Sequence, residues 1–453
     1  MTKLRLAIIG AGPAGIYAAD ILLRAERSFD VSIDLFEHLP APYGLVRYGV
    51  APDHPRIKGV IGALREVLDR GDIRLFGNVR FGTDLTLDDL KRHYNAVIFA
   101  TGAVRDADLD IAGIDAAGSF GAADFVSWFD GHPDVPRTWT LDATSVGVVG
   151  NGNVALDISR ILAKHAEDLL PTEVPANVYE VLEASPVTDV HVFGRRGPTS
   201  VKFTPLELRE LGELRDVDVV VSDEDFDYDD AAREAIATNK QVKVIDRILQ
   251  EWRTRPGLDG TASRRLHLHF FAKPTRLITD DAGRVAALEY ERTAPDGQGR
   301  VVGTGELRQV PMQQFYRAVG YFGSPLEEIP FDTDRGVIPN HEGQVIGADG
   351  AQIPGLYATG WIKRGPVGLI GHTKSDAMET IQHLIADEGL WWTPAEPSED
   401  AIPALLEERG IAWTDVEGWH LLDEHEIALG APHDRARIKV VPRDEMIRIS
   451  RAE

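Results

Sequence analysis

Short apolar runs alternate with amphipathic stretches along this chain of 453 residues. The runs predict β-strands, and apolar positions three or four apart predict α-helices. Alternating strands and helices are typical of parallel sheets covered by helices, so the pattern predicts an α/β fold. Strands are predicted at residues 3–9, 32–36, 73–76, 96–100, 145–149, 190–193, 217–221, 267–272, 285–291 and 356–358. Helices are predicted at 14–25, 56–70, 87–93, 122–129, 153–162, 205–211, 229–236, 243–253 and 374–388, and the acidic run 223–230 as a solvated loop and helix start.

Two glycine-rich turns each stand between a predicted strand and a predicted helix. The first is Gly10-Ala-Gly-Pro-Ala-Gly15 and the second is Gly150-Asn-Gly-Asn-Val-Ala155. In such a turn the first glycine permits a sharp bend, the second (Gly12 or Gly152) lets the backbone approach a pyrophosphate, and the third position packs the helix on the strand. The phosphates rest on the helix N-terminus. Two such turns predict two Rossmann-like dinucleotide-binding domains.

The residues that end each second strand distinguish the two dinucleotides. Glu37 follows the first turn by 27 residues and supplies a carboxylate suited to a ribose diol, as in FAD. After the second turn, the corresponding strand leads to Arg195 and Arg196, whose guanidinium groups suit a 2′-phosphate. We therefore expect FAD at the first turn and NADP(H) at the second.

Composition narrows the class of protein further. A chain of this length should split into two or three domains. It contains no Cys, which excludes disulfides, thiolate-bound zinc and an iron–sulfur cluster held by this chain. The net charge of −24 disfavours nucleic acid and anionic membranes as ligands. No signal-like segment and no run of 18 apolar residues occurs, so we expect a cytoplasmic protein.

Paired Ala-Thr-Gly strand ends predict where the two domains meet. Ala100-Thr-Gly102 and Ala358-Thr-Gly360 both end apolar strands, and small residues there admit close approach of a flavin. A weaker ending of this kind stands at 317–320. We expect residues 1–105 and 325–453 to form the FAD domain, with a C-terminal helical region, and residues 106–324 to be an inserted NADP domain.

Seven segments of the chain resemble the adrenodoxin reductase family, including the bacterial NADPH:ferredoxin reductases of that type. The resemblance extends from residue 3 past Trp419. It implies a monomeric two-domain flavoenzyme that takes hydride from NADPH onto FAD and passes single electrons to a ferredoxin-type iron–sulfur protein. The segments are Gly10-Ala-Gly-Pro-Ala-Gly15, Tyr43-Gly-Leu-Val-Arg-Tyr-Gly-Val-Ala-Pro-Asp-His-Pro55, Gly150-Asn-Gly-Asn-Val-Ala-Leu-Asp157, Gly194-Arg-Arg-Gly-Pro198, Leu206-Glu-Leu-Arg-Glu-Leu211, Gly360-Trp-Ile-Lys-Arg-Gly-Pro-Val-Gly-Leu-Ile-Gly371 and Gly418-Trp-His-Leu-Leu-Asp-Glu-His-Glu-Ile-Ala-Leu-Gly430.

The resemblance also implies the cofactor-binding residues. Where relatives place a further Arg near the adenosine, this chain has Ala107, with Arg105 two residues earlier. The residues implied for FAD are Ala14, Glu37, Leu45, Phe81, Trp361 and the backbone of Gly368, Leu369 and Ile370. Those implied for NADP are Asn151, Gly152, Asn153, Val154, Arg195, Arg196, Glu207 and again Gly368.

His54 and Glu210 match a family pair placed near the flavin ring. A histidine suits a proton relay because its ordinary pKa lies near neutrality. A structural His–Glu bond across a domain interface is an equally supported interpretation, and both can hold together. His267 and His269 share one face of a predicted strand, but no third ligand follows at metal-site spacing, so we expect surface histidines and no metal.

Other functions remain open on the sequence alone. A flavin-dependent monooxygenase, an amidotransferase-coupled reductase or a non-catalytic NADP(H)-sensing flavoprotein would use the same two nucleotide folds. If the acceptor is an acidic ferredoxin, docking needs a local basic patch because two acidic proteins repel. Lys240, Lys243 and Arg247 are predicted to share one helix face, with Arg264 and Arg265 nearby in sequence.

Overall fold

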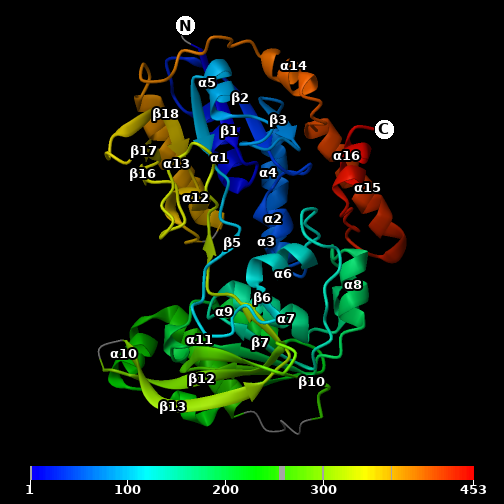
Figure 1. Cartoon of the computed structure of the whole chain (residues 1–453), viewed down its shortest axis with the longest axis vertical. Coiled ribbons are helices and arrows are strands. Elements are labelled where there is room, and N and C mark those ends of the chain that lie inside the picture. The colour runs from blue at the N-terminus through cyan, green and yellow to red at the C-terminus, as the bar shows by residue number, and fades with distance from the viewer. Residues whose placement is uncertain (1–2, 255–260, 298–299, 369) are drawn as a thin grey trace.

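The first of two large sheets combines strands from both ends of the chain. The computed structural model describes residues 3–254, 261–297, 300–368 and 370–453. The first sheet has the order β16-β17-β18-β4-β1-β2-β3, in which β18 to β3 are parallel and β16 to β18 are antiparallel (Figure 1). Its strands are β1 (Lys3–Ile9), β2 (Asp30–Glu37), β3 (Ile73–Gly77), β4 (Ala96–Phe99), β16 (Asn340–His341), β17 (Gln344–Ile346) and β18 (Gln352–Ala358).

Helices cover both faces of this sheet because its strands are apolar on both sides. In β1, Leu6 and Ile8 face one core and Ala7 and Ile9 face the other. The first core is closed by α1 (Pro13–Arg24), α4 (Val60–Leu68) and α13 (Ile370–Ala386), and the second by α5 (Leu87–His93) and α14 (Ala401–Glu408). Short helices α2 (Leu45–Tyr48), α3 (Pro55–Lys58) and α12 (Trp361–Arg364) lie on connecting segments.

The second sheet is entirely parallel and is built from the middle of the chain. Its order is β6-β14-β7-β8-β10-β9. The strands are β6 (Ser119–Gly121), β7 (Ser145–Val149), β8 (Asp189–Phe193), β9 (Val217–Val221), β10 (Arg264–His269) and β14 (Gln314–Arg317). One face is covered by helices, namely α6 (Ala122–Phe129), α7 (Asn153–Ala163), α8 (Ala176–Glu183), α9 (Pro205–Gly212) and α11 (Lys240–Arg253), and α10 (Asp230–Thr238) lies against α11.

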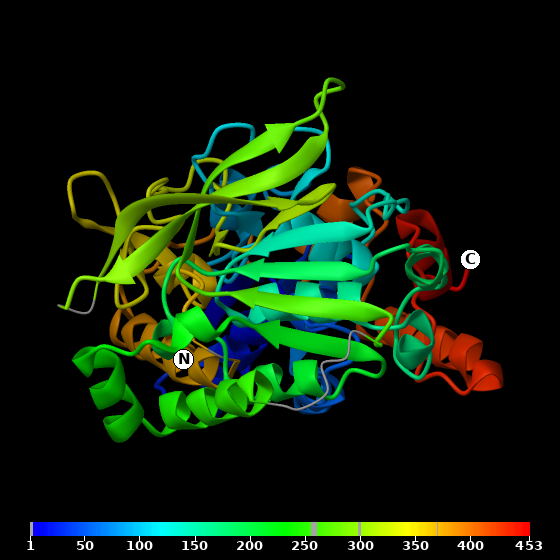
Figure 2. The ribbon, with the colours of Figure 1, turned by 90° about the horizontal axis from the view of Figure 1, so that it is seen from below.

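A three-stranded antiparallel sheet covers the other face of the second sheet (Figure 2). It consists of β11 (Ala272–Thr279), β12 (Val285–Pro295) and β13 (Val301–Pro311). Residues of β11 and β12, such as Leu277 and Leu288, pack with Val149 and Phe193 of the parallel sheet in a separate small core. The small sheet therefore covers the face of the parallel sheet opposite the helices.

The two sheet units are linked by a two-stranded ladder. β5 (Arg105–Asp106), on the way into the inserted segment, pairs antiparallel with β15 (Tyr321–Phe322), on the way out (Figure 1). After the first sheet is complete, the chain continues into α15 (Val416–Gly430) and α16 (Arg443–Ser450). The segment between these helices touches the inserted unit, where Ala436 N–H donates to Pro171 O. Short 3₁₀ helices lie at Ala166–Leu169, Pro198–Ser200, Asp223–Phe226 and Ala431–His433.

The predicted fold class is confirmed, whereas several local predictions were wrong or incomplete. The helix predicted over 56–70 is divided at Gly59, and the predicted strand 285–291 extends to Pro295. The strands β11 and β13 were not predicted. The acidic run is not wholly solvated, because Asp225 is buried and accepts a bond of 2.7 Å from Arg292 Nη1. Among the described residues, no helix is both long and apolar enough to cross a membrane.

Candidate active site

The first glycine turn leaves room only at its second glycine. Gly10 has φ +112°, and a methyl group there would lie 2.5 Å from Ala100 O. A methyl group on Gly15 would lie 2.0 Å from Gly10 O, so the helix can approach the strand only without a side chain. At Gly12, by contrast, the nearest atom is 3.9 Å away. The turn therefore opens one backbone position, at the N-terminus of α1, to a phosphate group.

Glu37 stands buried at the end of β2 beside this turn. Its carboxylate accepts bonds from the N–H groups of Ala11 (2.9 Å) and Leu39 (3.1 Å), and His38 Nδ1 lies 2.7 Å from it. Burial by itself raises the pKa of Glu37, but the His38 ring and the two amides outweigh burial and hold this pKa below its ordinary value. The carboxylate is thus ionised and fixed, with acceptor capacity left for a ribose hydroxyl.

Segments far apart in sequence meet at the first turn. Tyr43 N–H donates to Ala11 O over 2.8 Å, which brings the following residue, Gly44, and the start of α2 at Leu45 beside Gly12. A methyl group at Gly360 would lie 2.7 Å from Ala14 Cβ, so the loop that leads to Trp361 packs on α1. These contacts gather Ala14, Leu45 and Trp361 around one turn.

The other residues predicted to bind FAD lie in different parts of the chain, and the structure does not describe all of them. Phe81 packs edge-on against Phe99, the last residue of β4, at a ring distance of 5.4 Å. Gly368 is exposed with φ +89°, and Ile370 begins α13. Leu369 lies outside the described residues.

The second glycine turn repeats the geometry of the first. Gly150 has φ +152°, and a methyl group there would lie 2.1 Å from Ala318 O, whereas Gly152 has no atom within 4 Å. Asn151 packs against Gly194 at the end of β8, and Asn153 Oδ1 accepts from Thr204 N–H over 3.0 Å. Val154 is half-buried in the first turn of α7. This turn fits a second pyrophosphate.

Two exposed arginines and a buried glutamate flank the second turn. Within the described parts of the chain, the guanidinium groups of Arg195 and Arg196 make no hydrogen bond or ion pair. Glu207 is 5 % exposed, and its Oε2 is a buried atom that has no hydrogen-bond partner among the residues the structure describes. Such an orphaned acceptor fits a ligand that brings donors. Arg105 instead lies on β5 with its guanidinium 5.9 Å from the Phe322 ring.

His54 and Glu210 do come together, but as members of a larger cluster. His54, from the first unit, has Nδ1 3.4 Å from Glu210 Oε2 on α9. Its Nε2 lies closer to two residues of α7, at 2.7 Å from Asp157 Oδ1 and 2.8 Å from Arg160 Nη2. Asp53 binds Arg160 at 2.8 and 2.9 Å. The cluster joins the two sheet units at the helix that starts from the second glycine turn.

The cluster shifts both titratable members of the predicted pair. Burial by itself lowers the pKa of His54, but the Asp157 hydrogen bond and the Asp157 and Glu210 charges outweigh burial and Arg160, so this pKa is raised above 6.5. Burial raises the pKa of Glu210 above 4.5, against the opposing charges of His54 and Arg160. His54 therefore holds its proton to higher pH than a free histidine, as a proton-storing group should.

Sequence reasoning missed Asp157 and Arg160 as partners of His54. Both follow the second glycine turn at an i, i+3 spacing, which places them on one face of α7 and was the available signal. Beside them opens a cavity of about 420 Å³. It is lined by Asp53, Arg160, Lys164, Asp168, Glu210, Glu213, Leu214 and Arg215.

The histidines of β10 are not ordinary surface residues. His267 and His191 stack with ring centroids 4.4 Å apart and planes 11° from parallel, and His269 Nε2 lies 2.9 Å from His191 Nδ1. Asp189 lies close enough to share a metal ion with His191 and His267. A histidine nitrogen binds a metal ion that lies in the plane of its own ring, so two parallel, stacked rings cannot both bind one ion in this way. In addition, Arg265 already binds Asp189 at 2.9 Å. This stack therefore supports packing rather than metal chemistry.

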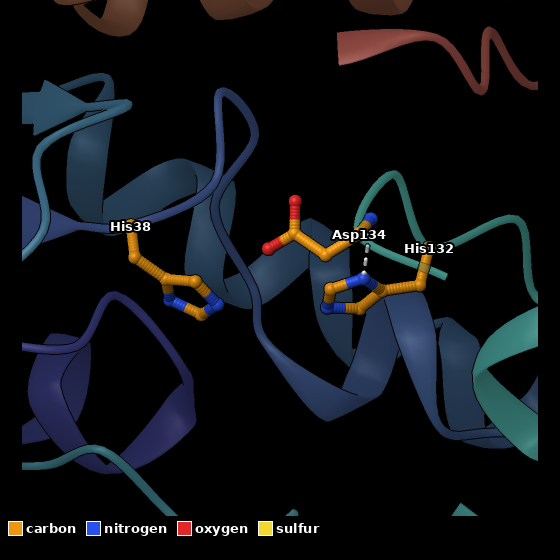
Figure 3. Close-up of side chains that lie close together, drawn as sticks. All are labelled: His38, His132 and Asp134. Atoms are coloured by element: carbon orange, nitrogen blue, oxygen red, sulfur yellow. Dashed lines mark hydrogen bonds between the residues drawn. The ribbon is translucent and has the colours of Figure 1, made fainter. Parts of the chain in front are cut away.

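A second histidine group consists of His38, His132 and Asp134, which lie close together (Figure 3), and His38 of this group contacts Glu37. His132 accepts from Asp134 N–H over 3.1 Å, and the Asp134 carboxylate is held by Arg443 at 2.7 Å and Arg80 at 3.1 Å. Burial lowers the pKa of His132 to about 4, so this ring is neutral. His38 thus stands near a neutral ring and keeps its own contact with Glu37.

Two glycine turns that fit dinucleotides, each on its own largely parallel sheet, and a titratable cluster between the two units are typical of a pyridine-nucleotide oxidoreductase. The family model described as pyridine nucleotide-disulphide oxidoreductase matches residues 4–195. The chain is 37 % identical to NADPH-ferredoxin reductase FprA of Mycobacterium tuberculosis, over 98 % of each chain. It is 36 % identical to human mitochondrial NADPH:adrenodoxin oxidoreductase, over 98 % of this chain and 91 % of that one.

A solved structure shows the same fold over the whole chain. Mycobacterium tuberculosis FprA in complex with NADPH superposes with a TM-score of 0.92 at 36 % identity, covering 99 % of both chains. The chain therefore belongs to the family of NADPH-ferredoxin and NADPH:adrenodoxin reductases, and the resemblance of its sequence motifs is confirmed.

Proposed function

We propose that this protein takes hydride from NADPH onto FAD and passes single electrons to a ferredoxin-type iron–sulfur protein. The observation that carries the proposal is the pair of glycine turns with different endings, a buried carboxylate at Glu37 and two exposed guanidinium groups at Arg195 and Arg196. The names of the matched relatives support this acceptor class. Since the chain has no Cys, the iron–sulfur cluster belongs to the partner.

The chain's own residues bind and orient the cofactors. When bound, FAD and NADP(H) supply the hydride and single-electron chemistry that side chains lack. Gly12 and Gly152 let two backbone segments approach pyrophosphates, and Glu37 accepts from the FAD ribose. Arg195 and Arg196 bind the 2′-phosphate of NADPH. The other members of the binding set are Gly10, Ala14, Gly15, Leu45, Phe81, Trp361, Gly368, Leu369 and Ile370 for FAD, and Asn151, Asn153, Val154 and Glu207 for NADP.

His54 holds the proton that accompanies two-electron reduction of the flavin, with Glu210 as its second carboxylate partner. The support is the raised pKa of His54 together with its place between the two units. The cavity beside Arg160 and Lys164 gives solvent protons a route to this cluster. A structural His–carboxylate bond across the interface holds at the same time.

We place the domain boundaries at 105/106 and 324/325. The support is the β5–β15 ladder, in which Arg105 and Phe322 pair and the chain crosses twice between the sheets. Residues 1–105 and 325–453 then form the FAD domain, and residues 106–324 form the NADP domain. We further propose a cytoplasmic monomer, as the resemblance to the reductase family implies; one matched relative is bacterial and is covered over 98 % of its length. Sedimentation analysis of the purified protein tests the monomer.

The acceptor docks on the exposed face of α11. Lys240, Lys243 and Arg247 are exposed there, and Arg247 forms a loose ion pair with Glu251, at 3.9 Å. The C-terminal half of α11 packs on α9, the Glu210 helix, through Trp252 and Gly212. Arg264 and Arg265 contribute less than their sequence suggests, because Arg265 is paired with Asp189 and Arg264 binds main-chain carbonyls.

One assay tests acceptor and docking face together. NADPH should reduce cytochrome c rapidly only when a ferredoxin is added. Changing Lys243 and Arg247 to Glu should lower this rate several-fold, mostly through association, while NADPH-to-ferricyanide turnover stays near wild type. Hydroxylation of a substrate, or no turnover, would favour the monooxygenase or sensor instead. Full ferredoxin activity of the reversal variant at low salt would remove α11 from the docking site.

A further inference from the structure

The arginine turn, residues 194–197, owes its position to its backbone. The side chains of Arg195 and Arg196 are exposed, and across the described residues neither guanidinium group has a protein partner that would orient it. Reading a phosphate with planar guanidinium forks depends on where these groups stand. Whatever fixes the backbone of this turn therefore also fixes what the two arginines can bind.

Donors from the β10–β11 connection, β11 and β12 hold three consecutive carbonyl groups of the turn. Ala272 N–H donates to Gly194 O over 2.9 Å, and Phe271 N–H donates to Arg196 O over 3.2 Å. Between them, the hydroxyl of Thr293 donates to Arg195 O over 2.7 Å. Thr293 is 5 % exposed, so water competes little for this carbonyl.

The aromatic ring of Phe271 packs directly against the turn and limits its movement. A methyl group on Gly197 would lie 2.3 Å from Phe271 Cζ, so ring and turn are already in contact. Phe271 itself has φ +52°, an uncommon value for a residue with a side chain. The turn thus rests on a residue whose backbone is held against its own preference.

This support is anchored deeper in the inserted domain. Phe271 O accepts from Thr293 N–H over 2.8 Å, which ties the two supporting residues together. The neighbouring Arg292 donates from Nη1 to Phe270 O over 2.9 Å and to Asp225, which is 1 % exposed, over 2.7 Å. The small antiparallel sheet and the buried acid of the 223–230 run therefore serve the same turn.

We propose that Thr293 and Phe271 are positioning residues that set the preference for NADPH over NADH. They act through Arg195 and Arg196, so the inference rests on the proposed reading of the 2′-phosphate by these arginines. The small sheet then has a chemical task in addition to covering the parallel sheet. NADH lacks the 2′-phosphate, so a displacement of the arginine turn should not change the binding of NADH.

The test is the ratio of kcat/KM for NADPH to that for NADH in the FAD-loaded enzyme. Thr293→Val keeps the side-chain shape and removes the hydroxyl, and it should lower this ratio about 3- to 10-fold through KM for NADPH, as expected for one buried hydrogen bond. Thr293→Ser should restore most of the ratio. Thr275→Val is the matched control, because Thr275 makes a similar bond to Glu289 O within the same sheet, away from the turn.

A second variant and a double-mutant cycle keep the outcome decisive. Gly197→Ala drives a methyl group into the Phe271 ring and should lower the same ratio even if Thr293→Val folds poorly. In an Arg195→Ala/Arg196→Ala background, Thr293→Val should have no further effect on the ratio. A simply destabilised protein would instead lose both cofactors' activities together.

The possible failures are distinguishable. If the double-arginine variant loses NADPH preference while Thr293→Val and Gly197→Ala keep it, the positioning inference is overturned and the proposed reading of the phosphate stands. If the double-arginine variant keeps its NADPH preference, both are overturned.

Discussion

Glu37 and the Arg195–Arg196 pair occupy equivalent places in the two dinucleotide cradles, yet they are held in opposite ways. Glu37 is 4 % exposed and is fixed through its own carboxylate by two amides and His38. The arginines are exposed, and only their backbone is held. The buried, preformed carboxylate of Glu37 suits a cofactor that remains bound, such as FAD. The exposed guanidinium groups on a fixed turn suit a cofactor that binds and dissociates in every turnover, such as NADP(H).

The largest expected effect comes from breaking the buried cradle. The wild-type protein should hold one FAD without a covalent bond. Glu37→Gln should weaken FAD binding about 100-fold, because an amide loses the charge-assisted bonds of the carboxylate, each worth about 1.5–3 kcal/mol. Mass spectrometry and absorbance of the heat-released cofactor measure this. Recovery of FMN from the wild type, or full FAD retention by the variant, contradicts the assignment.

A change at the border between the cradles should slow the reaction and leave both cofactors bound. His54→Gln and Glu210→Ala should reduce the rate of flavin reduction about 10-fold, below the roughly 10²- to 10⁴-fold typical of a general acid or base that acts directly on the reacting group. Because the pKa of His54 is raised, its protonated form persists above pH 6.5 and is lost as pH rises through the shifted value. His54→Gln should therefore lack the alkaline limb of the wild-type pH profile, and Glu210→Ala, which removes one of the charges that raise this pKa, should shift the limb to lower pH.

Stopped-flow traces with NADPH across pH provide the measurement. The same sign applies to stability, because protonated His54 stabilises the folded protein fully below pH 6.5 and loses this contribution above its raised pKa. Unchanged rates and pH profiles in both variants would leave the pair a purely structural contact.

The smallest expected effect is a difference between the two cradles in how strongly salt weakens cofactor binding. Screening shortens the reach of exposed charges from about 8 Å at physiological ionic strength to about 3 Å at 1 M. KM for NADPH should rise several-fold between low and high salt, with a smaller change for NADH, while bound FAD is retained. Equal salt responses of NADPH binding and FAD retention would erase the contrast between the exposed and the buried cradle.

The sequence was most informative where local chemistry dictates the backbone. The glycine turns predicted both cradles because Gly10 and Gly150 adopt positive φ against a neighbouring strand. The helix at Leu87–His93 was predicted with its full bounds, and its start is fixed by a capping box between Thr86 and Asp89. These signals lie within a few residues of the feature they specify.

What escaped prediction depends on distant partners or on weak burial. Most side chains of β13 are exposed, so the apolar alternation that marks a half-buried strand is absent. In the sequence Asp225 is one acid among many, and its burial is explained by partners at least 45 residues away, the Phe270 amide and the Arg292 guanidinium. Asp157 and Arg160 were visible as an i, i+3 pair, but their contact with His54 spans more than 100 residues.

The two-residue ladder of β5 and β15 brings together the two ends of the inserted middle part of the chain. Because Arg105 pairs with Phe322 and Asp106 with Tyr321, the ends of the inserted segment lie side by side, about 5 Å apart in a ladder of this kind. A nucleotide-binding segment grafted from a relative would have to match those two residue pairs. The graft must also keep Glu173, which Lys58 and Lys439 of the surrounding domain each grip at 2.7 Å.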